Sequence, residues 1–376
     1  MKLLSTDGSG TESRPVPFGS AARATAAALV GLAVLGGTAG PAFAAVGGQQ
    51  VCRIGDSRLD EISGMAATRD GYVVVNDGAD DPAGRKIFFL DRRCAVVRTV
   101  GYPSRPRDTE DLALGRDGTV WVADIGDNSA VRDTVALWRL APGGRAPELL
   151  RLKYPDGAHD AEALLLSPDG TPVIVTKTPL AAGAYVPVGP LGKGKTTALR
   201  LAGNVRLPVT TTSNPFSLAG RLVITGGAVS PDGTKAVLRT YADAFAFDVT
   251  GGDVVGAITG GEPRGTALSD EPQGESITYT PDGDALLTVS EGRRPAILRY
   301  PLRQTATATA TPAPAESTRT TPSEPAAATT APTAQAKPTS ASDRAGPLPV
   351  GLLVTGALLA AAATGLLLLR RRRKAR

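Results

Sequence analysis

The sequence contains a single histidine, His159, and only two cysteines, Cys52 and Cys94, among its 376 residues. A zinc site of thiolates and imidazoles is therefore disfavoured, because such sites combine several ligands of these two kinds. A Ser-His-Asp triad would have to use His159, and no G-x-S-x-G elbow is present to supply its serine. A lone histidine beside Asp160 is more often a hydrogen-bonded structural residue. These absences disfavour nucleophilic catalysis.

The body of the chain also lacks an excess of positive charge, although the net charge of the whole is +5. The last seven residues, RRRRKAR, carry six positive charges, and residues 1–44 carry a net charge of +1, which leaves −2 for the remainder. Nucleic-acid binding needs a concentrated basic face. We therefore expect no nucleic-acid partner.

Both ends of the chain predict export and membrane attachment. An apolar run over 24–40 precedes Ala42-Phe43-Ala44, which fits a cleavage site, so residues 1–44 are predicted to be a signal peptide. An uncleaved anchor is the alternative. The run 348–369 has 22 residues without a charge, which as a helix would span about 33 Å. We expect a transmembrane helix over 347–369 and a cytoplasmic basic tail over 370–376.

Residues 304–346, between the body and the predicted transmembrane helix, consist mainly of Thr, Ala, Pro and Ser. A segment of this composition cannot bury a core and is predicted to be disordered. It serves either as a stalk through a cell wall, with or without O-glycosylation, or as a passive linker. The chain is thus expected to be a single-pass plasma-membrane protein with its body, 45–303, outside the cytoplasm.

The body has no convincing amphipathic helix, and short β-rich runs repeat along it. Each repeat has an apolar run followed by an Asp-Gly turn, which favours a tight hairpin. The turns are Asp70-Gly71, Asp117-Gly118, Asp169-Gly170, Asp232-Gly233 and Asp282-Gly283. A third strand follows each hairpin, and a fourth follows in most copies. Four-stranded repeats of about 45–50 residues predict an all-β fold, a β-propeller.

We expect five blades, with a sixth blade between 178 and 222 as the alternative. The last copy lacks a fourth strand, and a spare strand at 51–55 precedes the first copy, so the two ends would pair to close the ring. A pair of β-sandwiches is the runner-up fold. Cys52 and Cys94 favour a disulfide in an exported protein, yet the outer edges that carry them are normally well separated in a propeller. The alternatives are therefore a displaced Cys52 or two unpaired thiols.

In four of the five copies, the residues nine and seven positions before the turn aspartate are both polar. Residues two apart on a strand point the same way. The second strands end in further polar residues, so all of these are expected on one face around the propeller axis. The candidate ligand-binding residues are Glu61, Asp108, His159, Asp160, Lys177 and Arg239. The candidate metal ligands are Glu110, Asp124, Asp127, Asn128, Glu162 and Glu275.

These oxygen-rich side chains suit Ca²⁺ or Mg²⁺ rather than zinc. Carboxylates held close together raise one another's pKa, and a bound cation relieves that repulsion. The alternative is that these acids cap turns and pair with Lys177, Arg239 and backbone amides around a water-filled channel.

Five segments carry a resemblance to a known family. They are LDEISGMA, DTEDLALGRDGTVWVADIGDN, HDAEALLLSPDG, TGGAVSPDGTKAVLRTYADAFAFDV and EPQGESITYTPDGDALLTVSEG. Together they resemble exported actinobacterial β-propellers that look related to the esterase-like phytase propellers and, more distantly, to NHL-type propellers. The resemblance covers about residues 50–303 and implies esterase or phosphoesterase chemistry. A calcium-dependent propeller phytase would hold phosphate with several bases, whereas only Lys177 and Arg239 fall at the predicted ring.

The sequence therefore predicts a cell-surface propeller that binds a ligand through its acidic face. A binding role is favoured over an enzymatic one. The partner would be an extracellular protein, a glycan or a small ligand, and the C-terminal helix would contact the membrane. One alternative is a metal-dependent extracytoplasmic hydrolase, in which the carboxylates hold a cation and Lys177 or Arg239 steadies an anion. A pure docking scaffold is the third interpretation.

Overall fold

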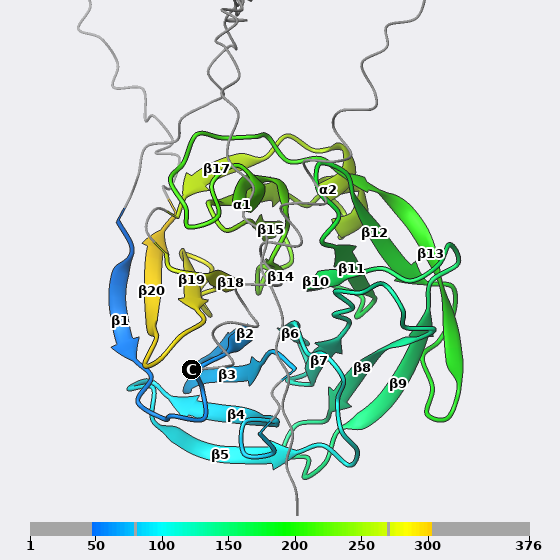
Figure 1. The fold of residues 1–376 in the computed structure, drawn as a ribbon, viewed down its shortest axis with the longest axis horizontal. Coiled ribbons are helices and arrows are strands. Elements are labelled where there is room, and N and C mark those ends of the chain that lie inside the picture. The colour runs from blue at the N-terminus through cyan, green and yellow to red at the C-terminus, as the bar shows by residue number, and fades with distance from the viewer. Residues whose placement is uncertain (1–46, 79–80, 269–270, 303–376) are drawn as a thin grey trace, which may run out of the picture. The chain divides into compact units, whose positions relative to one another are not determined.

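The computed structural model describes residues 47–78, 81–268 and 271–302 (Figure 1). The predicted signal peptide, stalk, transmembrane helix and basic tail lie outside these residues. In the part of the chain that is described, no helix has the length and apolar character needed to cross a membrane.

Strands dominate the described residues, which also hold two short helices, α1 (Ala219–Leu222) and α2 (Val254–Gly260). Successive strands form antiparallel meanders of four. The first two are β2 (Ile62–Thr68), β3 (Gly71–Asn76), β4 (Lys86–Asp91) and β5 (Val96–Gly101), then β6 (Asp111–Leu114), β7 (Val120–Asp124), β8 (Val135–Leu140) and β9 (Glu148–Lys153).

The next two meanders are β10 (Ala161–Leu166), β11 (Pro172–Thr176), β12 (Ala182–Pro187) and β13 (Thr196–Val205), then β14 (Gly226–Val229), β15 (Lys235–Arg239), β16 (Asp243–Asp248) and β17 (Arg264–Ala267). The last three strands are β18 (Gly274–Tyr279), β19 (Ala285–Ser290) and β20 (Ala296–Pro301). β1 (Gln49–Arg53) pairs with β20, so the first described strand completes the sheet begun by the last three.

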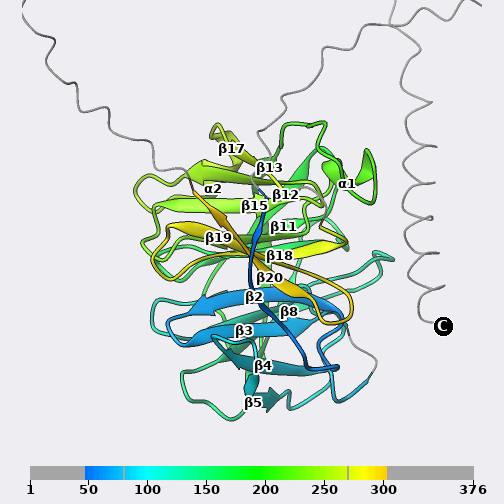
Figure 2. The same cartoon turned by 90° about the vertical axis from the view of Figure 1, so that its left-hand side faces the viewer.

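The first strands of the meanders surround a common axis, as Figure 1 shows in a view along it. β2, β6, β10, β14 and β18 each contact the next in order, and β18 contacts β2, which closes the ring. Figure 2 views the ring from the side and shows β2 to β5 next to one another. The expected all-β propeller architecture is confirmed, and a pair of sandwiches does not fit a closed ring of this kind.

Two meanders are joined at their outer edges into one eight-stranded sheet. β13 pairs in parallel with β9, with Thr196 opposite Arg151. The long interval between 178 and 222 therefore contains β12, the ten-residue β13 and α1, with no further four-stranded sheet among its residues.

An Asp-Gly turn connects the two strands of each innermost hairpin, as the repeat predicts. Gly118 has φ = 82°, a left-handed conformation that glycine adopts without a steric penalty. The Asp117 carboxylate accepts a hydrogen bond of 3.0 Å from the N–H of Thr119. Local turn chemistry thus sets where each innermost strand reverses, and it sets the register of the hairpin.

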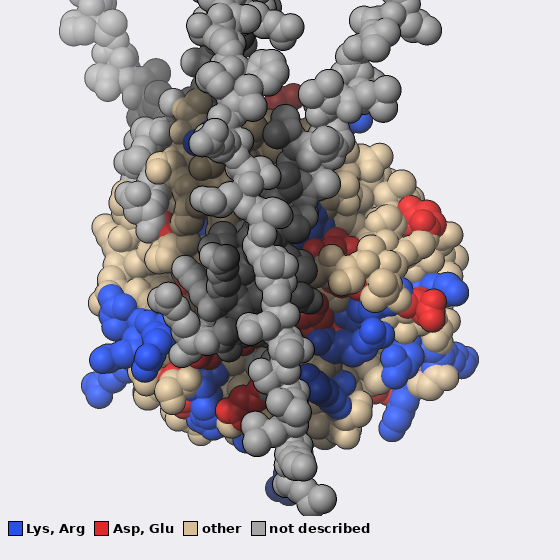
Figure 3. Space-filling model, viewed as in Figure 1, with Lys and Arg blue, Asp and Glu red and all other residues tan. Residues whose placement is uncertain are grey.

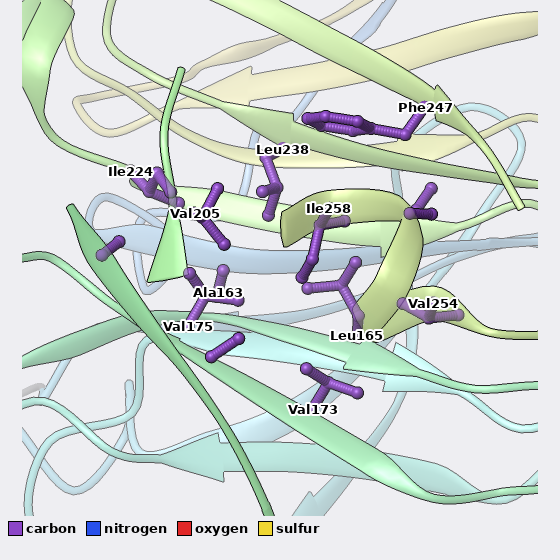
Figure 4. Close-up of a cluster of buried hydrophobic side chains, with 14 of the residues drawn as sticks. Ala163, Leu165, Val173, Val175, Val205, Ile224, Leu238, Phe247, Val254 and Ile258 are labelled. Carbon is purple, nitrogen blue, oxygen red and sulfur yellow. The ribbon is translucent and has the colours of Figure 1, made fainter. Parts of the chain in front are cut away.

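The hydrophobic core is divided among the spaces between neighbouring meanders. Figure 4 shows one such cluster, in which Leu165 of β10 packs with Leu238 of β15 and Phe247 of β16. Four further clusters fill corresponding spaces in the described residues. Burial of apolar side chains between sheet faces therefore holds the ring together, and the strand ends at the axis can carry polar groups.

A disulfide joins Cys52 to Cys94, with their Cα atoms 6.0 Å apart. Cys52 lies on β1, where a register shift follows Gln50, and Cys94 lies in the turn between β4 and β5. Cys94 is buried in the apolar cluster between the closing sheet and the β2–β5 meander. The bond links the outer strand of the closing sheet to the neighbouring meander, so it reinforces the point where the ring closes.

Replacing both cysteines with serine is expected to lower the free energy of unfolding by up to about 4 kcal/mol, because the bond closes a loop of 42 residues. Urea unfolding of the variant and of the reduced wild-type protein should give the same lowered midpoint. An unchanged midpoint in both would contradict a role of this bond in holding the ring closed.

Candidate metal centre

A β-bulge interrupts each innermost strand at the same place, seven residues before the turn aspartate. In β10, Ala161 is opposite Thr176 and Ala163 is opposite Val175, which leaves Glu162 as the extra residue. The same shift occurs in β2 and β18. Glu110 directly precedes β6, and its N–H donates to the carbonyl of Ala123, which is also opposite Asp111. Thr225 directly precedes β14, and its N–H donates to the carbonyl of Arg239, which is also opposite Gly226. The five bulged residues are Ser63, Glu110, Glu162, Thr225 and Glu275.

A bulge bends the strand and redirects the side chain of its extra residue. Where this residue is short, it bonds to the next strand around the ring. The Ser63 hydroxyl donates to the carbonyl of Thr109 at 2.9 Å, and the Thr225 hydroxyl donates to the carbonyl of Gly274 at 2.9 Å. The longer side chains of Glu110 and Glu162 extend past this position and converge with other carboxylates.

Five carboxylates form two triads that share one member. Within each triad, one oxygen from every residue lies within 4.8 Å of the others. The first triad is Asp77, Asp108 and Glu110, and the second is Glu110, Asp160 and Glu162. Asp77 follows the end of β3, and the other four occupy the predicted positions nine and seven residues before a turn. The count along the repeat therefore identifies four of the five members.

Two glycines leave the space that the first triad occupies. A Cβ on Gly126 would lie 2.1 Å from Oε1 of Glu110 and 2.7 Å from Oδ2 of Asp108. A Cβ on Gly78 would lie 2.5 Å from Oδ1 of Asp108. Any other residue at these two positions would displace the carboxylates.

Glu110 lies in an unfavourable electrostatic environment for a charged carboxylate. Its side chain is 1% exposed, and its Oε1 has no hydrogen-bond partner. Burial raises the pKa of Glu110 well above its usual value, and Asp77, Glu162 and Asp108 raise this pKa further, whereas Lys177 lowers it. A buried carboxylate that lies close to other carboxylates and has an oxygen without a hydrogen-bond partner is a site where a cation would be stabilised.

Lys177 connects the second triad to the neighbouring β14–β17 meander. Its Nζ forms an ion pair with Oε1 of Glu162 and lies 5.8 Å from the ring centroid of Tyr241. The Tyr241 hydroxyl donates to Oε1 of Glu275 at 2.9 Å, and Gln273 donates to the same oxygen at 3.2 Å. The predicted ligand Glu275 therefore binds Tyr241 and Gln273 and is in neither triad.

Asp124 and Asp127, both predicted metal ligands, hold the loop around the first triad in place. The Asp124 carboxylate accepts from the N–H groups of Arg107 and Asp108, from the Trp138 indole and from the Arg132 guanidinium. Oδ2 of Asp127 accepts from the N–H of Arg132 at 2.7 Å. Asn128 is exposed. The Asp124 carboxylate and Oδ2 of Asp127 therefore bind donors of the protein, and none of the three residues belongs to either of the two carboxylate triads.

Three predicted ligand-binding residues also have other roles. Arg239 is fully buried and bonds to Glu271 at 3.0 Å. His159 lies 2.9 Å from Asp156 and 3.0 Å from the Tyr185 hydroxyl. The Glu61 carbonyl accepts from the N–H of Asp77 at 2.7 Å.

Two residues that carry the site were not selected from the sequence. The Arg132 guanidinium donates to the Gly126 carbonyl at 2.6 Å and so fixes the loop beside Glu110. Asp111 is fully buried, and its Oδ2 accepts from Leu164 of β10 and Gly227 of β14 across the axis. Burial raises the pKa of Asp111 well above its usual value. Arg132 lies in a loop outside the repeat, so the repeat gives no signal for it. Asp111 directly follows Glu110, one of the positions found by counting back from the turn aspartate.

No family model and no curated protein matches the chain. Among solved structures, a streptogramin B lyase is 13% identical with a TM-score of 0.32, and the match covers 64% of this chain and 66% of that chain. A gluconolactonase from Xanthomonas campestris is 17% identical with a TM-score of 0.37, over 64% and 72% of the two chains. A third protein, described as a candidate gluconolactonase, is 14% identical with a TM-score of 0.37, over 64% and 75%.

These similarities correct one expectation. The three structures are described as a lyase and as gluconolactonases, so the leaning against an enzyme was wrong. None of the three supports the specific resemblance to esterase-like phytase or NHL propellers.

Replacing Gly126 with alanine is expected to weaken binding of a divalent cation by about tenfold or more, because the added Cβ displaces Glu110 and Asp108. Gly189→Ala is the matched control, since a Cβ there meets no atom within 4 Å. Calorimetric titration with Mn²⁺ measures both variants. Equal affinities for Mn²⁺ in the two would show that the first triad is not the binding site.

Proposed function

We propose that this chain is a metal-dependent hydrolase built on a five-bladed propeller, with its centre at the two carboxylate triads. The observation that carries the proposal is the first triad, in which Glu110 meets Asp77 and Asp108 and its buried Oε1 has no hydrogen-bond partner. Five innermost strands that contact one another in a closed ring support the proposed number of blades.

The residues present fit a hard divalent cation. The triad offers only carboxylate oxygens, which Ca²⁺, Mg²⁺ and Mn²⁺ prefer. Gly78 and Gly126 provide room beside these oxygens, and Asp124 and Arg132 hold the backbone around them. When bound, such a cation lowers the pKa of a coordinated water and polarises a carbonyl oxygen.

The remaining groups of the cluster suit the other needs of ester hydrolysis. Asp160 and Glu162 supply carboxylate oxygens that accept a proton from water. Lys177, paired with Glu162, places a positive charge where negative charge develops on the carbonyl oxygen. Tyr241, next to Lys177, gives this part of the site an aromatic wall.

The charge of the cluster favours a neutral ester or lactone over a phosphate ester. Five carboxylates face one ammonium, and Arg132 already donates to Asp124 and to the Gly126 carbonyl. A phosphate monoester brings up to two further negative charges and needs a cluster of basic residues. Arg239, the second base expected to steady an anion, is buried against Glu271.

The setting that we propose is the cell surface. The apolar and basic patterns of the two chain ends support a signal peptide, a stalk and a single transmembrane helix. The Cys52–Cys94 disulfide is compatible with an oxidising compartment. Substrates would then be small esters, or ester groups on envelope components, that reach the propeller from outside the cell.

A thermal melt of the full-length protein in EDTA, and then in excess Ca²⁺, Mg²⁺ or Mn²⁺, tests the cation site. At a hundredfold excess over the Kd, a bound cation adds about 2.7 kcal/mol, which corresponds to a rise in Tm of about 5–10 °C for a domain of this size. Glu110→Gln should abolish the rise. Glu262→Gln, at an exposed position, should retain it.

The same two variants test the chemistry with p-nitrophenyl acetate, a sugar lactone and p-nitrophenyl phosphate as substrates. We expect cation-dependent hydrolysis of the acetate or the lactone by Glu262→Gln and by the wild-type protein, and its loss in Glu110→Gln. Preferential hydrolysis of the phosphate would contradict the proposed substrate class. A cation-dependent rise in Tm without hydrolysis of any of the three substrates would contradict the hydrolase.

A further inference from the structure

The two carboxylate triads cannot be filled independently, because Glu110 belongs to both. The Oε1 of Glu110 is buried and has no hydrogen-bond partner, and the carboxylate of Glu110 offers an oxygen to each triad. The second triad differs from the first in one respect. Its member Glu162 already forms an ion pair with the Nζ of Lys177.

Lys177 is held firmly in this position. Its backbone N–H donates to the Asp160 carbonyl at 2.9 Å, which fixes the chain directly beside the second triad. Its side chain is 8% exposed, and the Nζ lies over the ring of Tyr241. Tyr241 is itself 1% exposed and bonded to Glu275. The ammonium is therefore enclosed between a carboxylate and an aromatic ring.

We propose that the Lys177 ammonium is the resident cation of the second triad, so that the protein binds one divalent cation, and that removal of this ammonium opens a second divalent site at Glu110, Asp160 and Glu162. The assignment of the first cation to Asp77, Asp108 and Glu110 rests on the proposed function. The assignment of Lys177 rests on its ion pair with Glu162.

An ammonium and a divalent cation exclude each other at the second triad because two positive charges at contact distance repel strongly at a buried site. The repulsion acts although Lys177 pairs with Oε1 of Glu162 and Oε2 of the same carboxylate is buried without a hydrogen-bond partner. Five carboxylates with one ammonium and one divalent cation leave a net charge of −2. Without the ammonium, a second divalent cation would bring the cluster to −1, so the site can accept it.

The proposed arrangement has a chemical consequence. In a two-metal site, the second ion stabilises negative charge that develops on the substrate. Here a covalently attached ammonium supplies that charge, and it cannot dissociate when the concentration of free cation falls. Lys177 would then make the site depend on the occupancy of one divalent cation only.

The test uses full-length protein and Mn²⁺ alone as the probe, with stoichiometry measured by equilibrium dialysis and metal analysis. Wild-type protein should bind one Mn²⁺, and Lys177→Met should bind two. Two Mn²⁺ bridged by Glu110 would be about 3.5–4 Å apart, so Lys177→Met should replace the signal of an isolated Mn²⁺ with an exchange-coupled paramagnetic resonance spectrum. Lys195→Met, at an exposed position, is the matched control and should bind one.

A double variant, Lys177→Met with Glu162→Gln, should return to one Mn²⁺ because the second triad then loses a ligand charge. Both substituted residues are uncharged, so the double variant leaves no unpaired charge at this buried position. It is therefore the variant to measure if Lys177→Met unfolds. In that event, binding of two Mn²⁺ by the double variant would overturn the proposal.

The outcomes separate this inference from the proposed function. Two Mn²⁺ in the wild-type protein, or one in a folded Lys177→Met variant, would overturn the inference and leave the first site intact. A second Mn²⁺ in Lys177→Met without exchange coupling would also overturn it, because that ion would be bound elsewhere. No Mn²⁺ in the wild-type protein and one in Lys177→Met would overturn the first site and support the role of Lys177.

Discussion

The site depends on one repeated backbone constraint, the β-bulge near the start of each innermost strand. The bulge redirects one side chain per strand, and the residue type at that position then decides its role. Serine and threonine reach only the carbonyl of the next strand and so fasten the ring. Glutamate just before β6 and within the adjacent strand β10 brings two carboxylates together, with Asp108 and Asp160 two residues earlier. The fold thus uses one device both for closure and for assembling a candidate site.

The carboxylate cluster is costly for the folded state, which argues that stability alone does not explain it. Glu110 is buried among like charges, and an ion pair such as Lys177 with Glu162 contributes little net stability once desolvation is counted. Apolar residues would pack at these positions without that cost. Five apolar clusters between the sheets and the Cys52–Cys94 bond at the closure of the ring stabilise the fold and offset this unfavourable free energy.

Features that depend on local order along the chain could be predicted from the sequence. The Asp-Gly turns and the alternation before them determine the hairpins, and counting back from each turn locates Asp108, Glu110, Asp160 and Glu162. Features that depend on long-range partners could not. Asp124 and Arg239 fall at strand ends on the expected face, but Arg132 and Glu271 hydrogen-bond to them, and neither of these partners lies in the repeat. Asp77 directly follows β3, the second strand of its hairpin, and only the fold shows that it meets Glu110.

Diffraction from crystals of the protein grown or soaked with Mn²⁺, recorded at the manganese absorption edge, tests the central claim most directly. The account predicts one strong anomalous peak among the carboxylate oxygens of Asp77, Asp108 and Glu110, with Lys177 still paired to Glu162. Carboxylates without a peak at saturating Mn²⁺, or a peak bound only at other residues, would contradict it.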